Sequence, residues 1–131
     1  MRLAAAALLL ALPACPAGAD PVGTFDIVGV NPGDGGDYKG TVEIERHGEV
    51  YRVIWRVSGT RYIGTGLGAK YDNGRFVVGP ASADDVAISI GYVSSGIFGQ
   101  AFYAQTSEGV WKGIWTYGGS DRIATEEWRR R

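Results

Sequence analysis

The residues that could do chemistry in this sequence are few, and they lack partners. The chain has one histidine, His47, and one cysteine, Cys15. His47 lies in the polar stretch Arg46-His-Gly-Glu49, at an expected hairpin tip where no rigid scaffold would hold the partners of a catalytic base. Zinc sites need several histidine or cysteine ligands. We therefore predict no catalytic residues, no metal site and no cofactor, in a protein that is not an enzyme.

Acidic residues occur in two adjacent pairs, Asp84-Asp85 and Glu126-Glu127. Neighbouring residues of a strand point to opposite faces, so Glu126 and Glu127 cannot flank one bond as two catalytic carboxylates. If Glu126 points inward, we expect it to form an ion pair with the nearby Arg122, buried or at the barrel mouth, rather than to act as a general acid.

The stretch Asn31–Gly40, NPGDGGDYKG, combines two aspartates and an asparagine with four glycines. A calcium loop of the EF-hand kind needs oxygen ligands at fixed alternate positions, a closing glutamate and flanking helices. This stretch lacks that spacing, and its flanks alternate like strands. Pro32, Asp34 and the glycines suit a tight connection. We interpret the stretch as a turn between the first two strands rather than as a calcium site.

Large aromatic side chains are the remaining feature, with four tryptophans and seven tyrosines in the chain. Their usual role is to fill a core. A barrel interior lined by rings can also hold a small apolar ligand, as in lipocalin-like and avidin-like barrels. Strands of about nine residues favour a packed interior over a sizeable cavity. The candidate ligand-binding residues of the interior are Tyr51, Trp55, Trp111 and Trp115.

The elements that must position these rings are strands. In Tyr51-Arg-Val-Ile-Trp-Arg-Val57 the large apolar residues alternate with arginines, which predicts one face toward a core and the other mostly toward water. No stretch after Gly23 shows helical spacing of apolar residues over three turns. Asn73-Gly74 is the strongest of several hairpin signals. The expected strands are 23–30, 38–46, 50–58, 61–69, 75–79, 85–94, 97–105, 109–117 and 122–128.

This pattern predicts an all-β fold, a small antiparallel up-and-down β-barrel of eight or nine strands. Closing the sheet removes its exposed edges, and glycines inside the strands, such as Gly64 and Gly113, suit the bends that closure requires. A β-sandwich is the alternative. No repeat or linker divides the chain, so residues 20–131 are expected to form a single barrel domain.

The first 19 residues have the build of a secretory signal peptide. A single positive charge at Arg2 is followed by an apolar run from Leu3 to Leu12, prolines, and small residues at Ala17 and Ala19, which suits cleavage before Asp20. The run is too short to predict a transmembrane span. The alternative is a lipobox, Leu12-Pro-Ala-Cys15, in which Cys15 is lipidated and anchors the protein to the envelope.

Composition excludes several classes of protein for the remaining 112 residues. Without Cys15 the domain has no disulfide and no thiol chemistry. Removing Arg2 with the signal leaves 12 Lys and Arg against 14 Asp and Glu, a net charge of −2. Because nucleic-acid-binding domains are usually basic, we predict no nucleic-acid partner. The closing Arg129-Arg-Arg131 is interpreted as a solvated tail.

Aromatic and glycine positions along nearly the whole mature chain resemble a family of small exported bacterial β-rich proteins, some of which carry the label fibronectin-binding protein. The label implies an adhesive role, with a host matrix protein among the candidate partners, and it carries over no site residues. The matching elements are Gly23-Thr-Phe25, Val28-Gly-Val-Asn-Pro32, Tyr38-x-Gly-x-Val-x-Ile44, Tyr51-x-Val-x-Trp55, Tyr62-x-Gly-x-Gly66, Gly113-x-Trp115 and Thr125-Glu126.

The export signal and the missing catalytic constellation together favour an exported, non-enzymatic binding module of the cell envelope, periplasmic or secreted. It would act as a monomer on an envelope or extracellular protein, or on a small apolar ligand. Two alternatives remain open: an envelope inhibitor of a protease or lysozyme, and a structural envelope protein without a discrete site.

Overall fold

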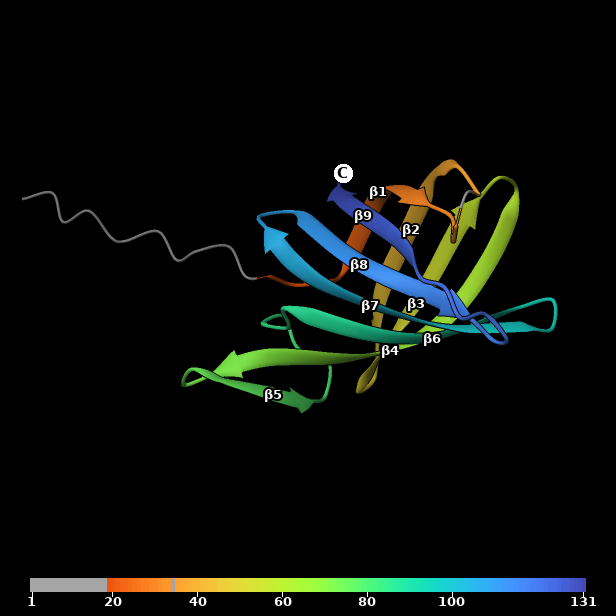
Figure 1. Ribbon diagram of the computed structural model, residues 1–131. Helices are drawn as coiled ribbons and strands as arrows, with labels where there is room; N and C mark the ends of the chain where they lie inside the picture. Colours follow the sequence, from red (N-terminus) through yellow and green to blue (C-terminus); the bar gives the residue numbers. More distant parts are fainter. Residues whose placement is uncertain (1–18, 34) are drawn as a thin grey trace, which may run out of the picture.

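The computed structural model describes residues 19–33 and 35–131, and within them the protein is all-β. The predictions for the signal peptide, Cys15 and Asp34 lie outside these residues. Nine strands follow one another along the chain (Figure 1). They are β1 (Gly23–Val30), β2 (Asp37–His47), β3 (Val50–Val57), β4 (Thr60–Asp72), β5 (Arg75–Gly79), β6 (Ala87–Ser94), β7 (Ile97–Ser107), β8 (Val110–Tyr117) and β9 (Ala124–Arg130).

Eight of these strands close into an antiparallel barrel. The sheet order is β3-β2-β1-β9-β8-β7-β6-β4-β5, and an additional β3–β4 pairing joins its two sides. The remaining strand, β5, is not part of the closed barrel. It pairs with β4 from Gly68 onward, just beyond Gly66, where the pairing of β3 with β4 ends. The β4–β5 hairpin therefore projects from the barrel (Figure 1), and the up-and-down barrel is confirmed over the sandwich.

The hairpin turns follow the local sequence signals. Asn73 and Gly74 have φ values of 50° and 75°, the left-handed region that a two-residue hairpin turn requires. The connection between β1 and β2 contains Gly33 and Gly36 at φ 65° and 77°. The stretch that begins at Asn31 is thus a strand connection, as its composition predicts.

Two strands begin later than expected because turns occupy their expected first residues. Strand β6 begins at Ala87 rather than 85, since the backbone N–H of Asp85 donates to the carbonyl of Ser82 (3.0 Å) in a turn. Strand β9 begins at Ala124 rather than 122, since the N–H of Arg122 donates to the hydroxyl of Ser120 (3.1 Å). In both places a local hydrogen bond replaces the strand ladder.

The core is the inward face of the barrel. Alternate residues of each strand are buried there, as with Phe25 and Ile27 on β1, which flank the exposed Asp26. Burying each large apolar side chain contributes roughly 1.5–3 kcal/mol. The fully buried large side chains include Phe25, Ile27, Val42, Ile44, Tyr51, Val53, Ile88, Ile90, Tyr103, Trp111 and Trp128.

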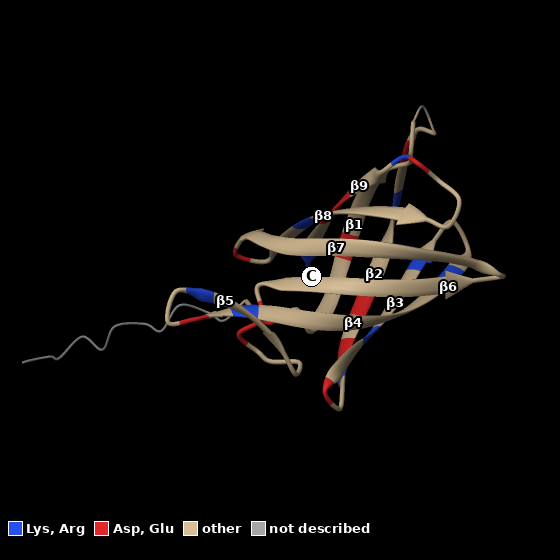
Figure 2. Ribbon diagram, turned by 60° about the horizontal axis from the view of Figure 1, so that its bottom comes forward, with Lys and Arg blue, Asp and Glu red and all other residues tan. Residues whose placement is uncertain are grey.

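The outer surface is divided by charge. Strands β2 and β3 carry outward charged residues, among them Glu43 and Arg56, which form an ion pair at 3.4 Å. Strands β6 and β7 carry no charged residue at all, and they cross Figure 2 as uncoloured ribbons. In the described part of the chain no helix is long and apolar enough to cross a membrane.

One end of the barrel, which we call the closed end, is covered by the connection 80–86 between β5 and β6. Ala81 donates its N–H to the carbonyl of Glu49 (2.9 Å). Asp85 is buried, and its Oδ2 accepts hydrogen bonds from the Tyr51 hydroxyl (2.5 Å) and the Ser82 N–H (2.9 Å). Gly68 permits this approach, because a Cβ at that position would lie 2.0 Å from Oδ2 of Asp85.

Candidate functional site

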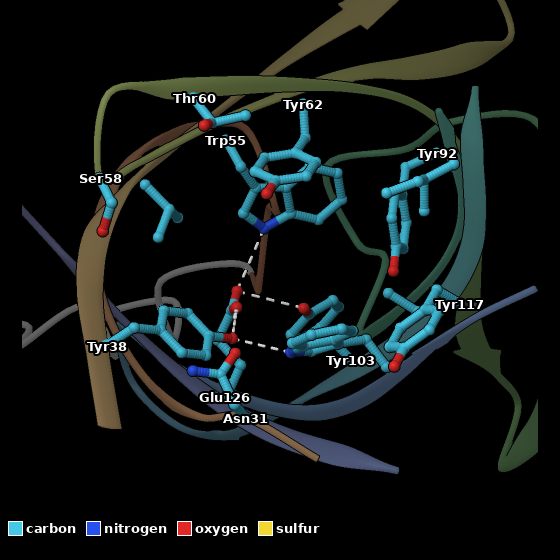
Figure 3. A pocket seen from close by; sticks show the side chains of 14 residues that line it. Asn31, Tyr38, Trp55, Ser58, Thr60, Tyr62, Tyr92, Tyr103, Tyr117 and Glu126 are labelled. Atoms are coloured by element: carbon cyan, nitrogen blue, oxygen red, sulfur yellow. Dashed lines mark hydrogen bonds between the residues drawn. The ribbon is translucent and has the colours of Figure 1, made fainter. Parts of the chain in front are cut away.

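The opposite, open end of the barrel contains a cavity of about 410 Å³ that is open to solvent (Figure 3). Its walls are mainly aromatic, and among the described residues no lysine, arginine or histidine lines it. Loops 31–36, 58–59, 95–96 and 118–123 surround this end. The lining residues are Asn31, Tyr38, Trp55, Val57, Ser58, Thr60, Tyr62, Tyr92, Ile97, Ala101, Tyr103, Trp115, Tyr117 and Glu126.

The four aromatic residues predicted from the sequence are divided between the two halves of the interior. Trp55 and Trp115 line the cavity. Tyr51 and Trp111 are fully buried nearer the closed end and do not line it. The reason is their position along the strands: β3 runs from Tyr51 toward Trp55, and β8 from Trp111 toward Trp115, each from the closed end to the open end. A packed interior therefore describes one half of the barrel, and the other half is hollow.

Glu126 lies on the floor of the cavity, at the centre of the aromatic side chains (Figure 3). It is 6% exposed and belongs to β9. Its Oε1 accepts hydrogen bonds from the indole N–H groups of Trp55 (3.1 Å) and Trp128 (2.5 Å) and from the Tyr103 hydroxyl (3.1 Å). Its Oε2 accepts one from the Tyr38 hydroxyl. Four neutral donors thus surround one carboxyl group.

A short chain of hydrogen bonds leads from the wall to this carboxyl group. The Trp115 indole N–H donates to the Tyr38 hydroxyl oxygen (2.7 Å), which in turn donates to Glu126. Burial, followed by the nearby charge of Glu126, raises the pKa of Tyr38 and of Tyr103. Both hydroxyls therefore stay protonated and act as donors.

The predicted ion pair between Glu126 and Arg122 is wrong. Arg122 precedes β9 in an exposed loop, where its guanidinium lies 3.9 Å from Asp121. The predicted opposite orientation of the two glutamates is confirmed, since Glu127 pairs on the outer surface with Arg129 (2.6 Å) and Lys112 (3.4 Å). The inward Glu126 is consequently left with uncharged neighbours.

Burial raises the pKa of Glu126, and the four donated hydrogen bonds act in the opposite direction. An indole N–H can only donate, so Oε1 must act as an acceptor toward Trp55 and Trp128. Any proton on this carboxyl group would therefore sit on Oε2, beside Tyr38. The geometry favours the ionised form locally, while desolvation disfavours it.

The close packing on the floor of the cavity depends on Gly113. A Cβ at this position of β8 would lie 2.2 Å from the Tyr103 ring and 2.3 Å from the carbonyl oxygen of Phe102. The Tyr103 ring also stacks on Trp128, with centroids 3.8 Å apart. Glycine at position 113 thus lets Tyr103 lie flat against the sheet and reach Glu126.

Other candidate positions show no such arrangement. His47 is exposed at the turn between β2 and β3. Among residues 19–33 and 35–131 there is no group of three or more His, Cys, Asp or Glu side chains that could hold a metal ion. Asn31 instead donates its side-chain N–H groups to the carbonyls of Gly35 and Gly36 (both 3.2 Å).

Comparison with known proteins identifies the fold. No protein-family model matches the chain, and no curated protein matches it significantly. Among solved structures, a redesigned β-barrel has a TM-score of 0.58 at 16% identity, covering 90% of this chain and 97% of its own. A de novo designed fluorescence-activating β-barrel has a TM-score of 0.54 at 18% identity, covering 89% of this chain and 99% of its own.

A third similar structure is a redesigned barrel, mFAP1, bound to DFHBI. It has a TM-score of 0.58 at 15% identity and covers 83% of this chain and 94% of its own. The chain shares the fold of these barrels. At such identities the likeness establishes the architecture only, and the site must be argued from its own residues.

Sequence reasoning missed most partners of Glu126. One signal was present: on the inward face of β9, Glu126 stands between Ala124 and Trp128, and a charged residue within an apolar face marks a candidate site. Tyr38 and Tyr103 also occupy inward positions of alternating strands. Their convergence on one carboxyl group required the closed barrel.

Proposed function

We propose that the protein is a non-enzymatic binding module that holds a small, largely apolar ligand in the open end of its barrel. The observation that carries this proposal is the solvent-open aromatic cavity with a single polar cluster on its floor. Its volume of about 410 Å³ lies within the range of roughly 300–1,000 Å³ found for small-molecule sites. Few, precisely placed polar groups in an apolar cavity are typical of such sites.

The chemistry of the cavity supports binding over catalysis. Its titratable groups are one carboxyl group, Glu126, and tyrosines such as Tyr38 and Tyr92. Burial raises the pKa of Tyr92 to about 12, so this hydroxyl does not serve as a base near neutral pH. Catalysis by acid and base requires a second group poised to exchange a proton with the reacting atoms, and no nucleophile and base face each other across this cavity.

Barrels of this fold can hold a ligand, since the similar mFAP1 barrel is bound to DFHBI. This supports the small-ligand form of the binding module over contact with a protein. Export, predicted from residues 1–19, is a further part of the proposal. The mass of the protein recovered from the cell envelope tests it, because cleavage before Asp20 and lipidation at Cys15 give different masses.

The proposal is tested with N-phenyl-1-naphthylamine, a neutral aromatic probe whose fluorescence rises in an apolar environment. We expect saturable binding with one probe per protein. Tyr62→Ala removes a ring from the cavity wall and should weaken binding by about tenfold, the equivalent of about 1.4 kcal/mol. Tyr71→Ala is the matched control, since Tyr71 lies on the same strand but is exposed on the β4–β5 hairpin.

Two outcomes would contradict the proposal. The first is absence of saturable probe binding by the folded wild-type protein. The second is binding that Tyr71→Ala weakens and Tyr62→Ala does not, which would place the probe on the outer surface near the hairpin.

A further inference from the structure

The carboxyl group of Glu126 lies in the cavity without a positively charged partner. Among the described residues that line the cavity, Glu126 is the only one with an acidic or basic side chain other than tyrosine, and its four hydrogen-bond partners are neutral. Every salt bridge found in the described residues involves other acidic groups. A buried charge is costly unless it is paired. In its ionised form, the carboxyl group of Glu126 therefore lacks a positively charged partner.

The hydrogen-bond geometry leaves an acceptor position for such a partner. A carboxylate offers about four lone-pair positions on its two oxygens. Oε1 of Glu126 already accepts three hydrogen bonds, whereas Oε2 accepts only the one from Tyr38. The unused capacity is therefore on Oε2, the oxygen beside Tyr38 on the cavity floor (Figure 3). A ligand N–H group near Oε2 would donate a hydrogen bond to the unused acceptor position of this oxygen.

The cavity walls suit a positive charge as well. Neighbouring rings are inclined to one another: Trp55 and Tyr92 at 64°, Tyr62 and Tyr92 at 86°, and Tyr38 and Trp115 at 67°. These edge-to-face contacts hold the rings in place around the cavity that they line. The face of an aromatic ring is electronegative and attracts cations, most strongly when water is excluded.

We propose that the ligand is an organic cation, an ammonium group joined to a small apolar body, with the ammonium beside Glu126 and the apolar part against the aromatic walls. This inference rests on the proposed function, since it names the class of ligand that the same cavity binds. A neutral ligand would leave the carboxylate unpaired, and an anionic ligand would be repelled by it. The absence of basic residues from the lining excludes a competing internal counter-ion there.

The test compares two molecules of equal shape that differ in charge, N,N-dimethylbenzylammonium, which carries one N–H, and isobutylbenzene. Each is titrated against the bound N-phenyl-1-naphthylamine probe, and the concentration that displaces half of the probe is measured. We expect the cation to displace the probe at a concentration at least about tenfold lower than its neutral counterpart, or about 1.4 kcal/mol in favour of the charge.

Glu126→Gln is the decisive variant because it removes the charge, can keep the three hydrogen bonds made to Oε1, and reverses the direction only of the one with Tyr38. The amide oxygen can take the place of Oε1 and accept from Trp55, Tyr103 and Trp128, while the amide N–H₂ can donate to the Tyr38 oxygen. We expect this variant to lose the preference for the cation, measured as the ratio of the concentrations at which the two molecules displace half of the bound probe. Tyr62→Leu is the second variant, since it keeps apolar volume but removes an aromatic ring, and it should reduce the preference for the cation over its neutral counterpart.

The possible failures are distinguishable. If wild type does not bind the neutral probe, the proposed function fails. If the probe binds but isobutylbenzene displaces it as well as N,N-dimethylbenzylammonium does, only the cation inference is overturned. Retention of the full preference in Glu126→Gln, with circular dichroism matching wild type, would also overturn it.

Discussion

The two ends of the barrel each hold a buried carboxyl group bonded to a tyrosine hydroxyl, yet one end is closed and the other is open. At the closed end Asp85 accepts a hydrogen bond from Tyr51 (2.5 Å), and at the open end Glu126 accepts one from Tyr38. The two carboxyl groups are the only buried polar or charged residues in the described part of the chain. They differ in what else surrounds them.

Asp85 belongs to a connection that folds over its end of the barrel, and its other donor is the backbone N–H of Ser82 (2.9 Å). Asp85 does not line the cavity of the open end. Glu126 belongs to a strand, and all of its donors are side chains, three of which also line the cavity. A carboxyl group surrounded by side chains of an open wall remains accessible to a ligand.

The largest expected effect separates Trp111 from Trp115, two inward tryptophans of the same strand. Trp111→Ala should lower the free energy of unfolding by about 3–5 kcal/mol, because its fully buried ring would leave a cavity in the packed half. Trp115→Ala should cost much less, about 1 kcal/mol, because this ring already borders a cavity. Chemical denaturation of both variants measures the difference.

Equal losses from the two tryptophans would contradict the division of the interior into a packed half and a hollow half. Probe binding sharpens the same comparison. Trp115→Ala should change the affinity for N-phenyl-1-naphthylamine, whereas Trp111→Ala, where it remains folded, should leave that affinity close to wild type.

A smaller effect is expected from removing the tyrosine hydroxyl at each end. Tyr51→Phe should lower the free energy of unfolding by about 1–3 kcal/mol, since it removes a donor from buried Asp85 and an acceptor from the Ser82 N–H. Tyr38→Phe removes a donor from Glu126 and the acceptor of the Trp115 N–H. It should cost no more than about 1 kcal/mol, because three donors to Glu126 remain and Trp115 borders a cavity that is open to solvent. Urea titrations of the two variants at neutral pH give both values, and a larger cost at Tyr38 would reverse the proposed contrast.

The barrel itself could be predicted from the sequence because strand alternation is a local property. The alternation that separates the two faces of a strand is visible within the seven residues Tyr51–Val57. The hairpin turn at Asn73-Gly74 is specified by those two residues. The strand ends near Asp85 and Arg122 could not be placed in this way. They depend on turn hydrogen bonds and, for Asp85, on a tyrosine 34 positions away.

The candidate site was predictable only in part for the same reason. Trp55, Trp115 and an inward Glu126 follow from alternation along single strands. The partners Tyr38 and Tyr103 are 88 and 23 positions from Glu126 in sequence and meet it only once the barrel has closed. The ion pair expected with Arg122 was wrong because nearness in sequence does not carry a loop residue into the interior.

The pH dependence of stability tests the environment of Glu126. Burial raises its pKa in the folded protein above the unfolded value, so between the two values the folded protein binds more protons. The stability of wild type relative to Glu126→Gln should therefore be greatest below the unfolded carboxyl pKa of about 4.3 and fall as pH rises through the raised folded pKa. A one-unit separation of the two values corresponds to about 1.4 kcal/mol.

The groups that face Glu126 do not obscure this effect. Tyr38 and Tyr103 have raised pKa values and stay neutral across the range, and Trp55 and Trp128 do not titrate. Thermal unfolding of both proteins between pH 4 and pH 8 measures the relative stability. A relative stability of wild type that increases with pH would contradict the raised pKa.

The last prediction is that calcium does not bind at the rim of the open end and so leaves the stability of the protein unchanged. The connection between β1 and β2 uses its carbonyls internally: the backbone N–H of Asn31 donates to the Gly36 carbonyl (2.9 Å), and its side chain donates to the carbonyls of Gly35 and Gly36. Calcium needs six to eight oxygen ligands, and carbonyls already engaged are poorly available for it. The melting temperature should therefore be the same with calcium as with a chelator. Because a ligand of the folded state must stabilise it, a calcium-dependent rise of several degrees would show that this rim holds a metal, and that the open end is organised by an ion as well as by Glu126.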